Sequence, residues 1–352
     1  MKNTALIVGG NGIIGRNMAT YLETKGNDWN IIVTSHSPLS YEGRFEFLRL
    51  DLTTRNAVEE QAEKLQEVTH IFFGAYMERQ TLAEQTSVNT RLLENLVRGI
   101  EKVAPNFKHI TFIQGGKAYG AHLGKYKTPA KETDARHFPP NFYFSQEDFL
   151  RQQSVGKAWS WTAMRPDMVI GVAIGNPMNL GTLIAVYASI CKELNVPMRF
   201  PGPDKAYEVL VNVTDAQLLA KGMEYVSVNE AANGQIFNIT NGDIYRWKEL
   251  WPKFGEYFDV TVNEPQTFSL ATYMADKNEL WEEMTQKYGL ANHSFGSLVQ
   301  WPFGDFIFNN IHDAFFDVNK LRRFGFQQMQ LDSFESFKRL FDQLKTSRII
   351  PS

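Results

Sequence analysis

A glycine-rich turn near the start of the chain constrains the fold more than any other feature of the sequence. The apolar run Thr4–Val8 leads into the segment Gly9–Gly15, which reads GGNGIIG, and a helical pattern follows at once. A buried strand that turns through glycines into a helix is the arrangement that binds a dinucleotide. The reason is that the helix N-terminus presents free N–H groups and a partial positive charge to a pyrophosphate.

Each glycine of this turn has its own expected role. Gly9 makes the tight turn, Gly12 lets the backbone approach the pyrophosphate, and Gly15 lets the helix pack close to the sheet. A chance glycine loop between a strand and a helix is the plain alternative. The residues predicted to contact the cofactor in this segment are Gly9, Asn11, Gly12, Ile13 and Gly15.

The composition narrows the possible partners. The chain has 352 residues, a formal net charge of −3 and a pI of about 6.2, so nothing predicts binding to nucleic acid or to an anionic membrane. Seven histidines are scattered singly, and the one cysteine, Cys191, excludes an internal disulfide. No apolar run reaches the ~18 residues of a membrane span. The N-terminus runs directly into the first strand, which leaves no room for a signal peptide. We expect a cytoplasmic protein without a metal.

Strand-like and helical patterns alternate through the first half of the chain. The strand-like runs are Thr4–Val8, Asn30–Thr34, Phe45–Leu50, Thr69–Gly74, His109–Gln114 and Trp159–Arg165. Helical patterns between them include Ile13–Lys25, Ala57–Leu65 and Thr86–Val103. Repeated strand–helix–strand units with apolar strands predict an α/β fold, a doubly wound parallel sheet over residues 1–170. Its ligand should lie across the carboxyl ends of the strands.

The second half differs in character. Gly171–Asn179 is loop-like, Leu180–Leu194 reads as a helix, and from Trp247 onward the sequence is rich in Phe, Trp and Tyr with few strands. We expect residues 171–352 to complete the core and to form a smaller, mostly helical lobe whose aromatic side chains border the substrate. Ordinary core packing is the alternative explanation of those aromatic residues.

The catalytic dyad of most short-chain reductases, Tyr-x-x-x-Lys on one helix face, occurs twice in unsuitable places. Tyr21 and Lys25 close the first helix, and Tyr273 and Lys277 lie in the C-terminal half, so both pairs are expected to be surface residues.

The helix after the fifth strand, where the dyad is expected, has Tyr143 but carries Glu147 in place of the lysine. Lys117 follows the fifth strand directly, on a loop that opens to the cofactor side of the sheet. The chemistry requires an ammonium near the phenol and does not require both groups on one helix.

These residues resemble the progesterone 5β-reductase and iridoid synthase-like enzymes, which are atypical extended short-chain reductases. The segment Gly115–Tyr119 is similar to that family's lysine motif, and Asn141–Asp148 is similar to its Asn-Phe-Tyr-Tyr-x-x-Glu-Asp motif. The resemblance covers essentially the whole chain. Further matching segments are Gly12–Gly15, Val68–Phe72, Arg165-Pro166, Met178–Leu183, Asn238–Gly242, Trp247-Lys248 and Arg322–Phe326.

The chain departs from the family in two places. Ala118 replaces the histidine after the lysine, which changes the hydrogen bonding expected around Lys117. Ser35 and His36 stand where the family commonly has two arginines for the 2′-phosphate of NADPH. No Asp or Glu ends that strand to hold a free ribose hydroxyl, so NADPH is favoured over NADH, with Ser35, His36 and Arg16 as candidate phosphate ligands.

Other cofactor contacts are predicted further along the chain. Asp51 and Leu52 follow the third strand and are candidates for contact with the adenine, although a cap at a helix start would look the same. Val169 and Met178 are predicted to lie near the nicotinamide or the pocket, and a helix start near Met178 is the simpler alternative.

The resemblance implies 1,4-reduction of a carbon–carbon double bond conjugated to a carbonyl. Tyr143 would stabilise the enolate oxygen by hydrogen bonding, and the Lys117 ammonium would favour the phenolate and contact the nicotinamide ribose. A pocket tyrosine without chemistry and a solvated loop lysine are the alternatives. The substrate pocket is predicted to include Tyr76, Tyr119, Phe142, Phe144, Trp301 and Phe303, each of which could equally be a core residue.

The expected substrate is a hydrophobic small-molecule enone, and the expected state is a monomer or homodimer. Three rival functions stay open at this point: a carbonyl reductase, an enzyme of the nucleotide-sugar epimerase type, and a sensor that binds NADP(H) without turnover. Epimerase chemistry predicts the Tyr-x-x-x-Lys dyad on the Tyr143 helix, and a sensor does not need both Lys117 and Tyr143.

Overall fold

The structure, a computed structural model, describes residues 2–175 and 178–352 and divides into two compact units. Unit 1 is made of residues 1–167, 216–239 and 316–329, and unit 2 of residues 168–215, 240–315 and 330–352. Unit 1 therefore takes two segments from the second half of the chain. Residues 176–177 of the predicted loop 171–179 lie outside the described residues.

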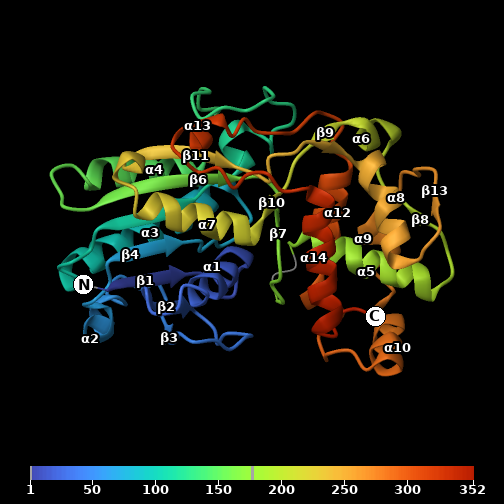
Figure 1. The fold of residues 1–352 in the computed structure, drawn as a ribbon, viewed down its shortest axis with the longest axis horizontal. Coiled ribbons are helices and arrows are strands. Elements are labelled where there is room, and N and C mark those ends of the chain that lie inside the picture. The colour runs from blue at the N-terminus through green and yellow to red at the C-terminus, as the bar shows by residue number, and fades with distance from the viewer. Residues whose placement is uncertain (1, 176–177) are drawn as a thin grey trace. The chain divides into compact units, whose positions relative to one another are not determined.

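Unit 1 is built on a seven-stranded sheet in which all neighbouring strands are parallel (Figure 1). The strand order is β11-β6-β5-β4-β1-β2-β3. The strands are β1 Asn3–Val8, β2 Trp29–Ser35, β3 Glu46–Arg49, β4 His70–Phe73, β5 His109–Ile113, β6 Ser160–Pro166 and β11 Gln235–Ile239. The six predicted strands and the parallel sheet are confirmed with small shifts at their ends, and β11 was not predicted.

Helices cover both faces of this sheet. On one face α1 packs beside α7, and on the other α3 packs beside α4. The helices of unit 1 are α1 Ile13–Glu23, α2 Ala62–Leu65, α3 Leu82–Val103, α4 Phe142–Gln153, α7 Ala216–Ser227 and α13 Asn319–Arg323, with the short 3₁₀ turns Glu59–Gln61, Gly116–Tyr119 and Glu230–Ala232. The fold is thus the predicted doubly wound α/β type.

The start of α3 shows why helix ends are hard to predict. The pattern of apolar residues predicts a helix from Thr86, whereas α3 begins at Leu82 because Thr81 and Glu84 form a capping box. The Thr81 hydroxyl accepts the Glu84 N–H at 3.2 Å, and the Glu84 carboxylate accepts the Thr81 N–H at 3.3 Å.

Unit 2 is mostly helical, with short strand pairs between the helices (Figure 1). Its helices are α5 Leu180–Glu193, α6 Asp204–Glu208, α8 Trp247–Phe258, α9 Leu270–Tyr273, α10 Asn278–Tyr288, α11 Phe295–Leu298, α12 Trp301–Phe308 and α14 Ser333–Thr346. Its strands are β7 Val169–Ile170, β8 Met198–Arg199, β9 Leu210–Val211, β10 Thr214–Asp215, β12 Tyr245–Arg246 and β13 Val262–Asn263.

Aromatic side chains form much of the core of unit 2. Fully buried members of this cluster are Trp247, Trp251, Phe254, Phe308, Phe337 and Phe341. Many aromatic side chains of the second half of the chain therefore pack in this core.

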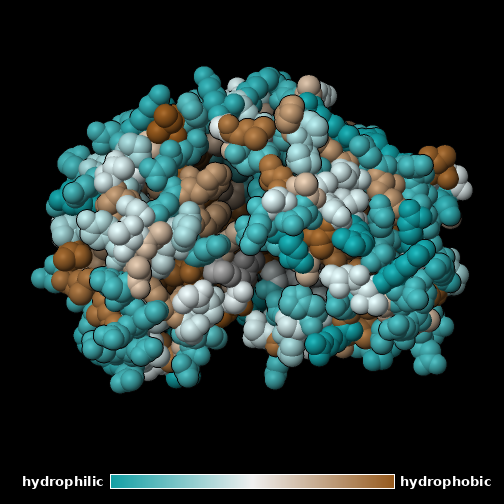
Figure 2. All heavy atoms as spheres, turned by 180° about the vertical axis from the view of Figure 1, so that it is seen from behind, coloured by the Kyte–Doolittle hydropathy of each residue, from teal (hydrophilic) through white to brown (hydrophobic). Residues whose placement is uncertain are grey.

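Figure 2 shows one face of the molecule, where hydrophilic residues predominate and hydrophobic residues form small separate groups. Among the described residues, no helix combines the length and the apolar character needed to cross a membrane.

Candidate active site

The glycine-rich turn joins β1 to α1 at the carboxyl end of the sheet. Gly9 has a φ of +92°, which L side chains rarely adopt. The N–H groups of Gly9 and Gly10 donate to the Thr34 carbonyl at 3.1 and 2.9 Å, so the turn is tied to β2. A Cβ at Gly15 would lie 2.3 Å from the Gly9 carbonyl oxygen. Only glycine lets α1 approach the turn this closely.

The N-terminus of α1 is open. Gly12 is its N-cap residue, and no side chain caps the first N–H groups of the helix. A Cβ at Gly12 would lie 3.2 Å from the Gly9 carbonyl oxygen, so the backbone itself forms the surface of the turn. Uncapped N–H groups behind a surface without side chains fit the pyrophosphate of a dinucleotide. Ile13, the first residue of α1, is buried.

Asn11 connects the turn to the loop after β2. Its amide nitrogen donates to the Ser35 and Ser37 hydroxyls at 3.2 and 3.1 Å and to the Pro38 carbonyl at 3.0 Å. Its amide oxygen accepts the Ser40 N–H at 3.2 Å. The Asn11 side chain therefore holds the loop. Ser35 is buried at the end of β2.

The residues after β3 are engaged in local structure. Asp51 accepts hydrogen bonds from the N–H and the hydroxyl of Thr53 at 3.0 and 2.7 Å, and these bonds hold the pKa of its carboxyl below the usual value. Leu52 is buried, and its carbonyl accepts from the Asn95 side chain at 2.8 Å. Asp51 thus stabilises a turn and does not cap a helix, because the next helical segment begins at Glu59 with Val58 as its N-cap residue. Contact with the adenine stays a prediction. Val169 and Met178 belong to unit 2, and their predicted contacts stay predictions as well.

Asn141 joins the loop of Lys117 to the helix of Tyr143. It is the buried N-cap residue of α4, and its side-chain oxygen accepts the Tyr143 N–H at 2.9 Å. Its side-chain nitrogen donates to the Lys117 carbonyl at 2.8 Å, and Nε2 of His137 lies against the same carbonyl. One side chain thus fixes both segments.

The Tyr143 hydroxyl lies beside the backbone of the lysine loop. A Cβ at Gly115 would be 3.4 Å from this hydroxyl oxygen and 3.4 Å from the Pro166 carbonyl oxygen. Among the described residues, no hydrogen-bond partner is found for the Tyr143 hydroxyl. The Lys117 ammonium lies 5.7 Å from the centre of the Tyr76 ring. The hydroxyl is therefore available to a ligand.

Burial shifts the pKa values of both members of this pair. It raises the pKa of Tyr143, the Tyr76 hydroxyl raises it further, and Arg165 is the cation that opposes the shift. Burial also lowers the pKa of Lys117, whose ammonium lies over the Tyr76 ring. The expected effect of Lys117 on the Tyr143 phenol therefore stays a prediction.

Glu147, in the position of the missing lysine, is a buried carboxylate. It is 3% exposed and accepts from Arg136 at 3.0 Å, from Arg151 at 2.9 Å and from Gln114 at 3.2 Å. Arg165, also buried, lies 3.7 Å from its other oxygen. A lysine at position 147 would face three guanidinium groups, so this neighbourhood requires a carboxylate.

Gln114 and Arg165 are buried polar residues near Tyr143 to which the sequence reasoning assigned no role. Arg165 Nε donates to the Gln114 side-chain oxygen at 2.6 Å, and the Gln114 side-chain nitrogen donates to the Tyr143 carbonyl at 3.1 Å. Gln114 follows β5, and Arg165 lies near the end of β6. Polar residues at the carboxyl ends of neighbouring buried strands were the signal that could have identified them.

The six predicted pocket residues have different environments. Tyr76 is 38% exposed, and its ring lies 5.7 Å from that of Phe142. Phe142 contacts the Tyr143 ring at 4.4 Å, so these two residues flank the site. Four others are packed against protein: Tyr119 against Phe316, Phe144 against Arg136 and His137, Trp301 against Phe295, and Phe303 against the core of unit 2.

The two other Tyr-x-x-x-Lys strings have partners of their own. The Lys25 ammonium lies 2.9 Å from Glu224, which also accepts from the Tyr21 hydroxyl. Tyr21 is buried, so the expectation that it is a surface residue is wrong. Lys277 pairs with Asp276, and Tyr273 is 61% exposed. Neither pair lies at the carboxyl ends of the sheet strands.

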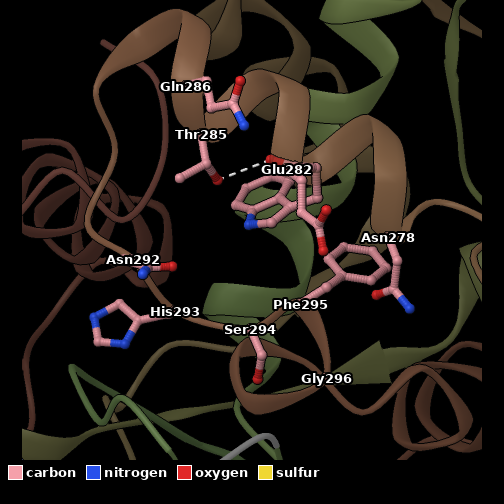
Figure 3. Close-up of a pocket in the computed structure, with 10 residues that line it drawn as sticks. Asn278, Glu282, Thr285, Gln286, Asn292, His293, Ser294, Phe295 and Gly296 are labelled. Atoms are coloured by element: carbon pink, nitrogen blue, oxygen red, sulfur yellow. Dashed lines mark hydrogen bonds between the residues drawn. The ribbon is translucent and has the colours of Figure 1, made fainter.

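A separate cavity of about 660 Å³ lies within unit 2, between α10 and residues 292–296 (Figure 3). The Thr285 hydroxyl at its wall donates to the Trp281 carbonyl at 2.8 Å. Its described lining contains neither a tyrosine nor a lysine and none of the predicted site residues. We assign it no part in the reaction.

Comparisons with known proteins identify the family to which the chain is similar. Residues 49–351 match a family model described as a PRISE-like Rossmann-fold domain. The short chain dehydrogenase gsfE of Penicillium aethiopicum is 35% identical, and the match covers 100% of both chains. The (S)-8-oxocitronellyl enol synthase ISY1 of Nepeta cataria is 30% identical, with 99% of this chain and 94% of that protein covered. The 3-oxo-Delta(4,5)-steroid 5-beta-reductase of Arabidopsis thaliana is 29% identical, with the same coverage.

Solved structures share the fold at lower identity. A UDP-glucose 4-epimerase from Thermotoga maritima gives a TM-score of 0.69 at 16% identity, with 98% of this chain and 99% of that chain covered. RMD from Pseudomonas aeruginosa, complexed with NADPH, gives a TM-score of 0.68 at 14% identity, with 98% and 100% covered. At this level of identity the likeness concerns the fold alone.

Proposed function

Because the chain belongs to the family of PRISE-like Rossmann-fold domains and is an oxidoreductase of the short-chain dehydrogenase type, we propose that it reduces enones with NADPH. The reaction is 1,4-reduction of the carbon–carbon double bond of an α,β-unsaturated ketone or aldehyde. The relative named as a steroid 5-beta-reductase supports this reaction class. The observation that carries the proposal is the Tyr143 hydroxyl, which has no hydrogen-bond partner among the described residues and lies beside the backbone of the loop that carries Lys117.

Tyr143 donates a hydrogen bond to the carbonyl oxygen of the substrate. Negative charge develops on that oxygen as the double bond is reduced, and a fixed donor stabilises it. A neutral phenol suits this role because a phenolate has no proton to donate. When bound, NADPH supplies the hydride that adds to the β-carbon. Lys117 binds the nicotinamide ribose and presents a cation beside the pocket.

The remaining residues bind and orient the two ligands. The turn from Gly9 to Gly15 holds the pyrophosphate, and Ser35 and His36 face the adenosine ribose. Tyr76 and Phe142 supply an apolar wall for a hydrophobic substrate. We propose a hydrophobic enone as substrate, no nucleic-acid partner, a monomer or homodimer as the active state and the cytoplasm as the place of action.

The test compares the wild-type enzyme with Tyr143→Phe, using 2-cyclohexen-1-one and progesterone with NADPH and with NADH. We expect saturated ketones, faster turnover with NADPH, and a kcat lowered about 100-fold to 1000-fold in the variant, the effect of losing one oxyanion donor. The affinity for NADP+ should be unchanged. Tyr273→Phe, at an exposed tyrosine of unit 2, is the matched control and should keep full activity.

Other products would identify a rival function. An allylic alcohol would make the protein a carbonyl reductase, and conversion of a UDP-sugar to its 4-epimer would make it an epimerase. The fold shared with an epimerase is the reason to include that substrate, although Glu147 replaces the lysine that epimerase chemistry predicts. Tight NADPH binding without turnover of any substrate would indicate a sensor.

A further inference from the structure

The carboxyl end of β2 lacks the charged side chain that usually recognises the adenosine ribose. In this fold it is the place where the adenosine ribose is recognised, by a carboxylate for a free 2′-hydroxyl or by a nearby arginine for a 2′-phosphate. Here β2 ends at Ser35, followed by His36, with neither a carboxylate nor an arginine. A phosphate monoester carries close to two negative charges at neutral pH and requires cationic partners. Those cations must come from other elements.

Arg49 reaches this place from the neighbouring strand. In the parallel pairing of β2 with β3, Ser35 lies opposite Arg49. Arg49 Nε donates to the His36 carbonyl at 3.0 Å, which fixes its guanidinium at the end of β2. The side chain is exposed, and its two terminal nitrogens have no hydrogen-bond or ion-pair partner among the described residues. Two free N–H donors in a planar fork suit a phosphate.

Arg16 approaches from the helix side. Its guanidinium lies over the Tyr41 ring at 4.7 Å, and the Tyr41 hydroxyl donates to the Gly10 carbonyl at 3.0 Å. Arg16 is thereby held against the glycine-rich turn. Its Nη1 atom is buried without a partner, and burial lowers the pKa of the side chain. A buried cation without an anion is costly, and an anionic ligand would offset that cost.

Two serine hydroxyls at and just after the end of β2 have O–H groups available to donate. The Ser35 hydroxyl oxygen accepts from Asn11 and from the Ser37 N–H at 3.3 Å, and the Ser37 hydroxyl oxygen also accepts from Asn11. Since each oxygen already accepts, each O–H remains to donate to another acceptor. Asp51, the nearest carboxylate in this region, is occupied by Thr53.

From these contacts we propose that Arg16 of α1 and Arg49 of β3 together bind the 2′-phosphate of NADPH, with the hydroxyls of Ser35 and Ser37. The chain thus supplies from two other elements the positive charge that is absent directly after β2. This inference rests on the proposed use of NADPH and names the residues that determine the preference for NADPH over NADH.

Cofactor binding without substrate tests the inference. Isothermal titration with NADP+ and with NAD+ gives both affinities for the wild type and for Arg49→Gln, Arg16→Met and the double variant. We expect each single variant to lose about 10-fold to 100-fold in NADP+ affinity, the effect of one charged hydrogen bond. The NAD+ affinity should stay within about twofold, because NAD+ lacks the phosphate. Methionine at position 16 keeps an unbranched side chain against Tyr41.

Arg55→Gln is the matched control, since Arg55 is an exposed arginine in the turn after β3. It should leave both affinities unchanged. Equal effects of Arg49→Gln and Arg55→Gln would indicate general surface charge and overturn the inference. Should Arg16→Met fail to fold, Arg49→Gln still decides, because Arg49 is exposed and its removal leaves no cavity.

The outcomes separate this inference from the proposed function. If the wild type binds NADP+ more tightly than NAD+ and both arginine variants keep that ratio, the phosphate site lies elsewhere while the use of NADPH stands. If the wild type binds both cofactors equally, the proposed preference for NADPH fails and the inference fails with it.

Discussion

The polar groups at the two ends of the sheet in unit 1 differ in whether they have hydrogen-bond partners. At the amino ends of the strands, Glu224 accepts from Trp29 Nε1 at 3.1 Å and from Lys25 at 2.9 Å, and the Thr69 hydroxyl accepts the Thr4 N–H at 2.8 Å. At the carboxyl ends, the Tyr143 hydroxyl and the first N–H groups of α1 have no such partners among the described residues.

The contrast distinguishes residues whose hydrogen bonds stabilise the fold from residues whose hydrogen-bonding groups are available to a ligand. The Trp29, Lys25 and Thr4 donors at the amino ends are satisfied within the protein. The free donors at the carboxyl ends are held by a second layer that is itself satisfied, namely Asn141, Gln114, Glu147 and Arg165. Three predictions, in order of expected effect, test this division.

The largest effect is expected for Glu147→Lys, which restores the Tyr-x-x-x-Lys motif in the sequence. The new ammonium would lie among Arg136, Arg151 and Arg165, so the free energy of unfolding should fall by more than about 5 kcal/mol, since removing one partner of a buried pair alone costs 3–5. Urea unfolding followed by circular dichroism measures it. Glu147→Gln, which keeps the shape, should cost less. A stable and more active Glu147→Lys enzyme would show that the activity does not depend on a lysine at position 117.

A smaller effect is expected from two buried histidines at the amino ends. Burial lowers the pKa of His70 to about 4 and that of His109 to about 3, from an ordinary value of 6.5. The unfolded chain therefore binds protons that the folded protein does not. Stability should be complete above pH 6.5 and fall as the pH approaches 4, by about 2 kcal/mol per histidine.

Unfolding by urea at a series of pH values measures this loss. His70→Gln should unfold with a shallower dependence on pH than the wild type, whereas His293→Gln, at a partly exposed position of unit 2, should keep the wild-type slope. An unchanged slope in His70→Gln would mean that His70 does not gain a proton on unfolding.

The smallest change in stability is expected for Asn141→Asp. This variant tests separately the role of Asn141 in capping α4 and its role in positioning the Lys117 loop. Aspartate still caps α4, so the free energy of unfolding should change by less than about 1 kcal/mol. It cannot donate to the Lys117 carbonyl, so we expect kcat to fall by roughly 10-fold, the value of one hydrogen bond. Glu224→Gln at the amino ends should do the reverse: lower stability by about 1 kcal/mol with kcat unchanged.

The parts of the fold that depend on local sequence were predictable. The turn from Gly9 to Gly15 is specified by backbone conformation, so its glycines identify it wherever it occurs. The apolar strands β1 to β6 are bounded by polar residues and were recognised. Strand β11 was not, because it lies far along the chain from the other strands and joins β6 only through a pairing between residues 162–166 and 235–239.

The candidate site was predictable only in part, for a related reason. Lys117 and Tyr143 were identified by a motif, and the structure brings their backbone segments together through Asn141. The direction of the Lys117 ammonium was not predictable, because it depends on Tyr76, from a different part of the chain. The same holds in part for Glu147. Arg151 lies four residues further along α4, but Arg136 and Arg165 come from other segments, and no local pattern indicates that they meet Glu147.

The discontinuity of unit 1 has a consequence for how the chain is made. On the ribosome, the first six strands emerge well before α7, β11 and α13, which follow after the first segment of unit 2. Until then β6 is an edge strand with open hydrogen-bonding groups, and the face that α7 covers is bare. At 5–20 residues per second this interval lasts roughly several seconds. The nascent chain therefore carries a half-finished sheet that is prone to aggregate, and chaperones that bind exposed strands should matter most during that interval.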